Sequence, residues 1–218
     1  MDPEAAIIEN QSLPLKESST IEERKVKLNR QWSFWENYEP KDRDKKKYDY
    51  SLLLKNIYTF TDLISFWQFW NAYPGSTPSN IFYNGEYIRY YFIEKYRIIA
   101  MNLFQNGIRP EWEDEKNKRG KVLTLEYVVS NDLDRFMKTV EKTWTNLMLS
   151  VIGENLLYSN YVNGVRFIDK TQLGGGKRIM FRFEVWTNKN ITEDELASLK
   201  EYLGKNFGCS GISVKDIN

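Results

Sequence analysis

The stretch WEDEKNKRG, residues 112–120, combines one tryptophan, three consecutive acids and a basic run that ends at glycine. A cation is attracted to the face of an aromatic ring, and most strongly to an indole. A carboxylate can accept two hydrogen bonds from the Watson–Crick edge of guanine, which presents two adjacent donors. Trp112 followed by Glu113 therefore suits a flat cationic base, and the Arg and Lys residues farther along suit its phosphates.

The composition excludes several other kinds of chemistry. The chain has one cysteine, Cys209, and no histidine, so it cannot form an internal disulfide, a thiolate or imidazole zinc cluster, or a Ser-His or Cys-His nucleophile pair. Its 31 Lys and Arg nearly balance its 30 Asp and Glu, unlike proteins that coat nucleic acid through net positive charge. Any anion-binding site must therefore be local.

The length of 218 residues suits a single domain with a core of its own. Residues 1–27 are polar and without periodicity, so we expect a flexible tail before a domain over 28–218. No apolar run approaches the roughly 18 residues of a membrane span, and no signal peptide is evident. We expect a soluble protein of the cytoplasm, with the nucleus as a further location.

Residues 61–71 are expected to form a helix, because an N-cap candidate precedes apolar residues at helical spacing. One face of this helix consists of Phe66, Phe69, Trp70 and Tyr73. Leu63, Ile64 and Trp67 extend the apolar surface too far around the cylinder for a single core stripe.

Two further helices are expected over 132–152 and 192–204. The core stripe of helix 132–152 leaves Leu149 on the other side of the cylinder. The expected boundary signals are, in chain order, the cap Asn131, the stop Gly153, the capping box Thr192 to Glu195, and the stop Gly204.

Strand character is found in six runs, which are 28–38, 97–104, 121–129, 161–169, 178–187 and 212–217. Some spacers, such as Leu173 to Gly176, are too short for crossover helices, so the sheet should be mainly antiparallel. About three helices packed against one such sheet make an α+β fold.

Several short blocks, taken together and in order, resemble the mRNA cap-binding eukaryotic translation initiation factor 4E family. The blocks are 107–120, 131–136, 151–154, Phe66-Trp67 and Trp70-Asn71, and the resemblance covers Leu28 to the C-terminus. It implies a curved antiparallel sheet with the helices on its convex side and a 7-methylguanosine cap on its concave side. It also implies a binding protein without catalytic residues, cofactor or metal.

Carried over residue by residue, Trp112 is similar to one of the two stacking aromatics and Glu113 to the carboxylate that pairs with guanine. Tyr50 stands where most family members have the other stacking tryptophan, as in the repressor-type 4E-homologous branch, and Tyr48 is an alternative in another register. Because a phenol stacks less extensively than an indole, we expect weaker cap binding than with two tryptophans. Trp186 matches the residue that contacts the methyl group.

The phosphate-binding residues are assigned on the same resemblance. Arg182 matches a phosphate-binding lysine, and Lys170 falls near a phosphate-binding arginine. Arg166 lies on the same strand face as Lys170 and is the alternative to it. Lys121 follows Gly120 directly, where the family usually has two more residues, so its role in phosphate binding is the least well matched.

A second surface is implied for protein partners. Trp67 matches the helix tryptophan to which scaffold and repressor proteins bind through a short helical motif, and Leu63 and Leu149 match its apolar neighbours. Thr145 occupies a position that is normally leucine in this groove, so partner specificity is expected to differ.

Several residues have a simpler structural interpretation. Trp32, Trp35, Trp70 and Trp144 are expected to pack in the core. Residues 114–119 are expected to form a solvated turn with weak ion pairs. An insertion over 74–96, rich in tyrosine, is expected to cap the sheet rather than to bind RNA.

The leading function is therefore a non-enzymatic factor that joins capped mRNA to an initiation scaffold. The nearest alternative is a cap-binding repressor that does not bind the scaffold. A metal-dependent hydrolase that uses Glu113, Asp114 and Glu115 is disfavoured, because consecutive carboxylates point in alternating directions. A general single-strand RNA binder is disfavoured by the balanced charge.

Overall fold

The computed structural model describes residues 26–40, 53–87, 91–92, 96–129, 131–172, 178–209 and 211–218. Of the expected tail, 1–25 lie outside this part of the chain. Val26 and Lys27 belong to the fold: the Val26 carbonyl accepts a hydrogen bond from the Leu63 amide at 3.0 Å, and Lys27 begins the first strand.

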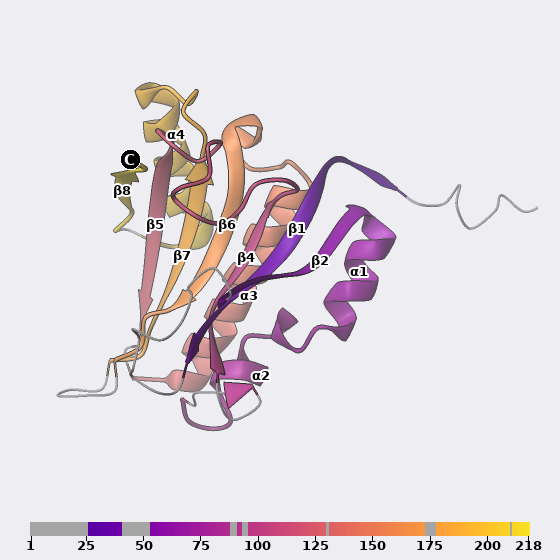
Figure 1. Cartoon of the computed structure of the whole chain (residues 1–218). Helices are drawn as coiled ribbons and strands as arrows, with labels where there is room; N and C mark the ends of the chain where they lie inside the picture. The colour runs from indigo at the N-terminus through magenta and orange to yellow at the C-terminus, as the bar shows by residue number, and fades with distance from the viewer. Residues whose placement is uncertain are drawn as a thin grey trace, which may run out of the picture.

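One antiparallel sheet forms the centre of the molecule (Figure 1). Its strands are β1 Lys27–Pro40, β2 Leu54–Asp62, β3 Tyr91–Phe92, β4 Tyr96–Gln105, β5 Lys121–Val128, β6 Val162–Asp169, β7 Met180–Thr187 and β8 Ser213–Asp216. The order across the sheet is β2-β1-β4-β6-β7-β5-β8, with β3 paired to one end of β4. Every strand pair among the described residues is antiparallel, which confirms the prediction from the short spacers.

The helices of the described chain cover one face of this sheet. They are α1 Leu63–Ala72, the single-turn α2 Ser79–Phe82, α3 Leu133–Ile152 and α4 Glu193–Phe207, with 3-10 turns η4 Pro74–Ser76 and η5 Ser159–Tyr161. Figure 1 looks onto the opposite face, with α3 and α4 behind the strands. We call this opposite face the open face. The α+β fold class is confirmed.

The local sequence signals predict the positions of most helices correctly, but some helix ends differ from the prediction. The N-cap of α1 is Asp62, whose carboxylate accepts the Ser65 amide at 2.9 Å. The N-cap of α3 is Asp132 rather than Asn131. The capping box at Thr192 is present, but α4 continues through Gly204 and ends at Gly208, whose φ of 66° favours glycine. Gly153 ends α3 as expected.

No alternating pattern predicts β2, because it lies at the edge of the sheet and only three of its residues are buried. These are Leu54, Phe60 and Asp62. The wider apolar surface of α1 has the expected outcome: Phe66 and Trp70 are buried against β1 and β2, whereas Trp67 is 41% exposed.

Tryptophans and phenylalanines fill the core between sheet and helices. Trp32, Trp70 and Trp144 are buried, which confirms their assignment to packing. Trp35 is different: it is half-buried on the open face, where the Arg109 guanidinium lies 5.7 Å from the centre of its ring. The assignment of Trp35 to the core was wrong, because it alternates along β1 with Phe34, which takes the core side.

The insertion over 74–96 completes the core at one end of the sheet. Phe82 is 1% exposed and packs its ring 5.4 Å from Phe181 and 5.7 Å from Phe167. The Tyr87 hydroxyl donates to buried Asp169, and the Tyr83 hydroxyl to Asp134 of α3. In its described residues the insertion is therefore a structural cap, as expected.

Of the helices that the structure describes, none has both the length and the apolar character required to cross a membrane.

Candidate functional site

The open face is built from three rows of side chains that run across the strands. Each row contains residues that pair with one another in the antiparallel register, so their side chains point the same way. The first row is Ser33, Phe104, Gly164, Trp186 and Val122; the second is Trp35, Asn102, Arg166, Glu184 and Thr124; the third is Asn37, Ala100, Ile168, Arg182 and Glu126. Aromatic groups therefore lie beside charged ones.

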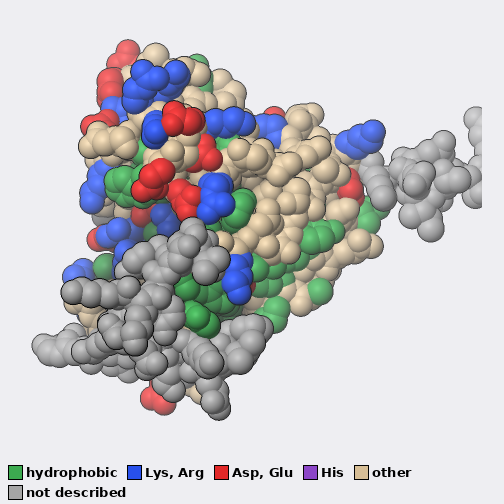
Figure 2. Space-filling view, in the orientation of Figure 1, with side chains coloured by type: hydrophobic (Ala, Val, Ile, Leu, Met, Phe, Trp, Pro, Cys, Tyr) green, Lys and Arg blue, Asp and Glu red, His purple; other side chains and the backbone are tan. Residues whose placement is uncertain are grey.

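Charges of both signs are visible on this face in Figure 2, where acidic and basic side chains lie intermingled next to hydrophobic ones. The mixture agrees with the balanced composition, since the part of this face that the described residues form is not a basic surface. Any attraction for an anion must come from a few cations in a defined arrangement.

The loop that carries Trp112 is held by side chains buried beneath it. The Asn117 amide donates to the carbonyls of Arg109 and Glu111, both at 2.8 Å, and its oxygen accepts the Asn163 side chain at 2.9 Å. The Asp114 carboxylate accepts the amides of Arg109 and Lys116 at 2.8 and 2.9 Å.

These contacts correct the expectation of a solvated turn. Asn117 is 0% exposed, and Asp114 organises the loop backbone as a local cap. Glu115 does behave as expected, because it is exposed and pairs with Lys118. All residues of the turn 114–119 are polar or charged, so the sequence does not indicate that Asn117 is buried.

Gly120 closes the loop against the sheet at a position where no larger residue fits. A Cβ atom there would lie 1.9 Å from the Thr187 carbonyl oxygen, which belongs to the backbone and cannot move aside. The Gly120 amide also returns to the Asn117 carbonyl at 2.9 Å. The loop is thus fixed at both ends, and Trp112 is presented from a rigid base.

Trp112 projects from this loop with 46% of its surface exposed. Its ring stands edge-on to Trp186, with centroids 6.0 Å apart and planes at 85°. Trp186 is 0% exposed and packs in turn on Phe104 at 5.6 Å. Trp112 therefore offers a ring face to solvent on an aromatic support, which is the arrangement that a stacking ligand requires.

Trp186 is buried, and its predicted contact with a methyl group stays a prediction. In this arrangement its surface is covered, so a ligand cannot touch it unless the side chains above it move. Its observed contacts are structural: it supports Trp112, and its indole N–H donates to Glu184 at 2.9 Å.

Glu113 follows Trp112 and is exposed. Among the described residues its carboxylate forms no hydrogen bond and no ion pair, in contrast to the acids on either side of it. It is therefore free to accept hydrogen bonds from a base stacked on Trp112.

The three cations of the candidate phosphate site gather on the same side of β6 and β7. Arg166 and Arg182 lie in adjacent rows, and Lys170 follows β6. Burial, and then the neighbouring charge of Arg182, lower the pKa of Lys170, while burial lowers the pKa of Arg166. The cations crowd one another, and an anion would relieve that repulsion.

Comparison with known proteins agrees with this geometry. The sequence model of the family described as "Eukaryotic initiation factor 4E" matches residues 27–211. This chain belongs to that family. The 4E-family chain is 28% identical over 179 residues to eukaryotic translation initiation factor 4E of Candida albicans, with 82% of this chain and 71% of the relative covered. It is also 28% identical to the Eremothecium gossypii factor, with 79% of this chain and 66% of the relative covered.

Solved structures show the same fold. C. elegans eIF4E-3 in complex with the 4E-binding protein Mextli superposes with a TM-score of 0.64 at 19% identity, covering 88% of this chain and 93% of that one. Ascaris suum eIF4E-3 with m7G cap gives a TM-score of 0.64 at 21% identity, covering 88% and 91%. At these identities the likeness concerns the fold alone.

Lys121 of the 4E-family chain does not join the other cations. Lys121 directly precedes Val122 on β5, so its side chain points to the opposite face of the sheet, which the helices cover. Its ammonium group pairs there with the carboxylates of Glu193 and Asp216, both at 2.8 Å. The ion pairs with Asp216 and then Glu193 raise its pKa. Strand register directs the Lys121 side chain away from the open face, so this arrangement does not support its predicted role in phosphate binding.

The second stacking residue cannot be placed. Tyr50 and its alternative Tyr48 both lie outside the described residues, so the choice between them stays a prediction. Among the described residues of the open face, the Arg109 guanidinium lies 5.7 Å from the centre of the Trp35 ring, and Arg109 is itself paired with Glu111 at 2.6 Å.

The predicted partner surface lies on the helices. Leu63 and Trp67 are one turn apart on α1, with Leu63 half-buried and Trp67 exposed. Leu149 is half-buried on α3 and borders a small hollow of about 290 Å³ that it shares with Asn146 and Tyr202. Large exposed apolar side chains on helices otherwise packed against a core are typical of protein-binding sites.

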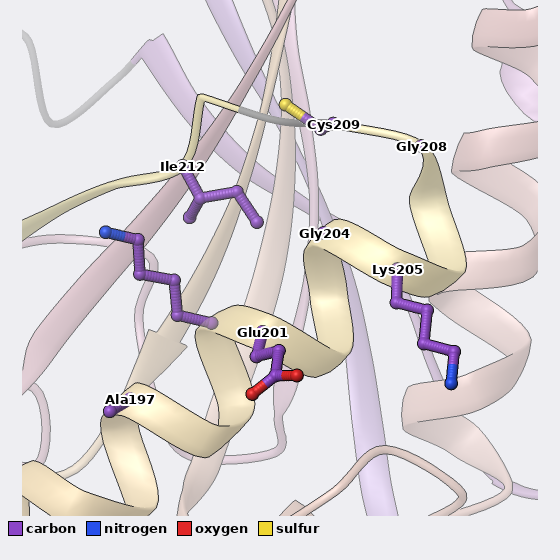
Figure 3. A pocket seen from close by; sticks show the side chains of 8 residues that line it. Ala197, Glu201, Gly204, Lys205, Gly208, Cys209 and Ile212 are labelled. Atoms are coloured by element: carbon purple, nitrogen blue, oxygen red, sulfur yellow. The ribbon is translucent and has the colours of Figure 1, made fainter.

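A separate groove of about 690 Å³ lies between α4 and the segment that precedes β8 (Figure 3). Its lining includes Ala197, Lys200, Glu201 and Ile212, with Cys209 at one end. It contains no aromatic ring on which a base could stack. We therefore assign the candidate site to the open face around Trp112 and not to this groove.

Proposed function

We propose that the 4E-family chain binds the 7-methylguanosine 5′ cap of mRNA on its open face. The exposed ring of Trp112, set edge-on against Trp186 and followed by the unpaired carboxylate of Glu113, is the observation that supports this most directly. The methylated base carries a positive charge and would stack on Trp112, while Glu113 would accept the hydrogen bonds of its edge. Arg182 and Lys170 would face the phosphates.

The same proposal gives the protein no catalytic role. Asp114 points into its own loop, and Glu115 is paired with Lys118, so neither carboxylate converges with Glu113 on one point. Within the described chain no three His, Cys, Asp or Glu residues are grouped so that they could hold a metal ion. The alternative of a metal-dependent hydrolase therefore has no support from the geometry.

As a cap-binding factor, the protein would act in the cytoplasm.

Cap binding is tested by titrating 7-methyl-GTP and GTP while following tryptophan fluorescence. We expect the methylated ligand to bind about a hundredfold more tightly, which corresponds to roughly 3 kcal/mol. Trp112→Ala should weaken binding of 7-methyl-GTP by about ten- to a hundredfold, since base–aromatic stacking contributes about 1–3 kcal/mol.

Trp67→Ala serves as the matched control in this titration, because it also removes an exposed indole but on the helix-covered side of the molecule. It should leave the affinity unchanged. Equal binding of both nucleotides, or a Trp112→Ala variant that binds as well as the unmodified protein, would contradict the proposal.

We also propose that Leu63, Trp67 and Leu149 bind a helical segment of an initiation scaffold or of a 4E-binding repressor. A tryptophan at the centre of such an interface usually contributes about 2 kcal/mol or more. Trp67→Ala should therefore weaken binding of a peptide from a 4E-binding protein by about thirtyfold, measured by calorimetry.

Gln68→Ala is the control for the partner surface, because Gln68 is the exposed neighbour on the same helix. Partner binding that survives Trp67→Ala would rule out this surface. Capture of the scaffold by the unmodified chain would support a role in initiation, whereas capture of repressors alone would support the repressor alternative.

A further inference from the structure

Glu184 occupies the centre of the candidate phosphate site. It is 8% exposed and lies in the middle row of the open face, between Arg166 on β6 and Thr124 on β5. One carboxylate oxygen accepts the indole N–H of Trp186 at 2.9 Å and lies 3.4 Å from the Arg166 guanidinium. The other oxygen lies 3.9 Å from the guanidinium of Arg182. A buried acid thus connects the aromatic support of Trp112 to both arginines.

The guanidinium of Arg166 is largely engaged by neighbouring residues and is therefore poorly accessible to a ligand. Its Nε donates to Asn102 at 2.8 Å, its guanidinium lies 5.4 Å from the centre of the Trp186 ring, and its side chain is only 14% exposed. A guanidinium held on three sides in this way serves to compensate Glu184. Arg166 is therefore part of the support beneath the site, and the role of phosphate ligand is left to Arg182 and Lys170.

Arg182 is in turn shared between two acids. Its Nη2 pairs with Glu126 across the strands at 2.6 Å, in addition to its longer contact with Glu184. Three cations, Arg166, Arg182 and Lys170, are thus opposed by two carboxylates, which leaves one net positive charge. A phosphate that approaches Arg182 must compete with Glu126 and must also come near the negative charge of Glu184.

We infer that Glu184 is a specificity-determining residue that limits how much affinity each phosphate of a cap ligand contributes. The inference rests on the proposed cap-binding function and deepens it. The protein reads the methylated base through Trp112 and Glu113, and it discriminates only weakly among 7-methylguanosine mono-, di- and triphosphate. At separations of several Å near a protein surface, one unit charge changes affinity by about fivefold or more.

The experiment compares the unmodified chain with Glu184→Gln, in which the amide oxygen can still accept the Trp186 indole N–H. Affinities for 7-methylguanosine and for its mono-, di- and triphosphate are measured by tryptophan fluorescence. In the unmodified chain, the triphosphate should bind no more than about tenfold more tightly than the monophosphate. In Glu184→Gln, this ratio should rise by about fivefold or more, whereas the affinity for the nucleoside should change less than about twofold.

Glu193→Gln is the matched control, because it removes the same charge from an exposed position on the opposite face, beside Lys121. It should leave the ratio unchanged. A Glu184→Gln ratio equal to that of the unmodified chain would overturn the inference. So would an equal loss of affinity for the nucleoside and for every phosphate, since that result would mean that Glu184 only supports Trp186.

Failure of the proposed function has a different signature. If the unmodified chain does not prefer 7-methylated ligands over unmethylated ones, cap binding is wrong, and the role of Glu184 is then decided with GTP and inorganic tripolyphosphate. Tighter binding of both by Glu184→Gln, and not by Glu193→Gln, would support the inference. Unchanged binding would overturn it.

Discussion

Phe82→Ala should lower the free energy of unfolding by about 3–5 kcal/mol, the usual cost of removing a fully buried phenylalanine. Phe82 is 1% exposed, and its ring contacts Phe167 of β6 and Phe181 of β7. The substitution leaves a cavity between the insertion and the sheet, which neighbouring backbone cannot fill. In a chain of 218 residues, this corresponds to a decrease in Tm of roughly 10 °C, measurable by calorimetry.

Glu86→Ala is the control for this prediction, since Glu86 belongs to the same insertion and is exposed. It should change the free energy of unfolding by less than about 0.5 kcal/mol. A Phe82→Ala protein that unfolds within about 1 kcal/mol of the unmodified chain would show that the insertion is not part of the core. The prediction does not depend on cap binding.

Asn117→Ala should lower the free energy of unfolding by about 2–4 kcal/mol, because it removes three hydrogen bonds of a buried amide, at about 0.5–1.5 kcal/mol each. These bonds join the Asn117 side chain to the carbonyls of Arg109 and Glu111 and to the side-chain amide of Asn163. The loop that carries Trp112 should then open before the rest of the fold. Amide exchange at Arg109 and Lys116, whose N–H groups are bonded to Asp114, should become faster by about a hundredfold or more.

Lys116→Ala provides the comparison for the loop, because the Lys116 side chain is exposed and only its backbone takes part in the network. Its exchange rates should match those of the unmodified chain. If Asn117→Ala keeps full protection at Arg109, then the buried amide does not hold the loop, and the rigid presentation of Trp112 must come from Gly120 and the sheet alone.

Much of the fold follows from local signals. The capping box at Thr192, the stop at Gly153 and the apolar spacing of α3 each involve residues within a few positions of one another, so they are readable without knowledge of the rest of the chain. β2 was missed because an edge strand with exposed side chains has no periodic pattern. α2 was missed because a single helical turn has too few residues to show one.

The candidate site was predicted unevenly for the same reason. Trp112 and Glu113 could be named because their types, their adjacency and the family blocks around them point to one chemistry. Glu184 gives no signal in the sequence, because it is the single acid of a strand whose residues are mostly apolar. Its importance comes from Arg166, which is distant in the sequence and opposite it in the sheet. A pattern of charged residues at matching positions of two paired strands would have been the signal, but it requires the register.

The sequence by itself therefore determined the family, the fold class, and the main helices and strands, and it predicted Trp112 and Glu113 as candidate site residues. Only the tertiary structure decided that Asn117 is buried, that Lys121 faces the helices, that Trp186 is covered, and that Glu184 lies between two arginines. The physical reason is that burial and charge pairing depend on strand register and on loops folding back onto the sheet. Those contacts join residues that are far apart in the chain, so no local sequence pattern predicts them.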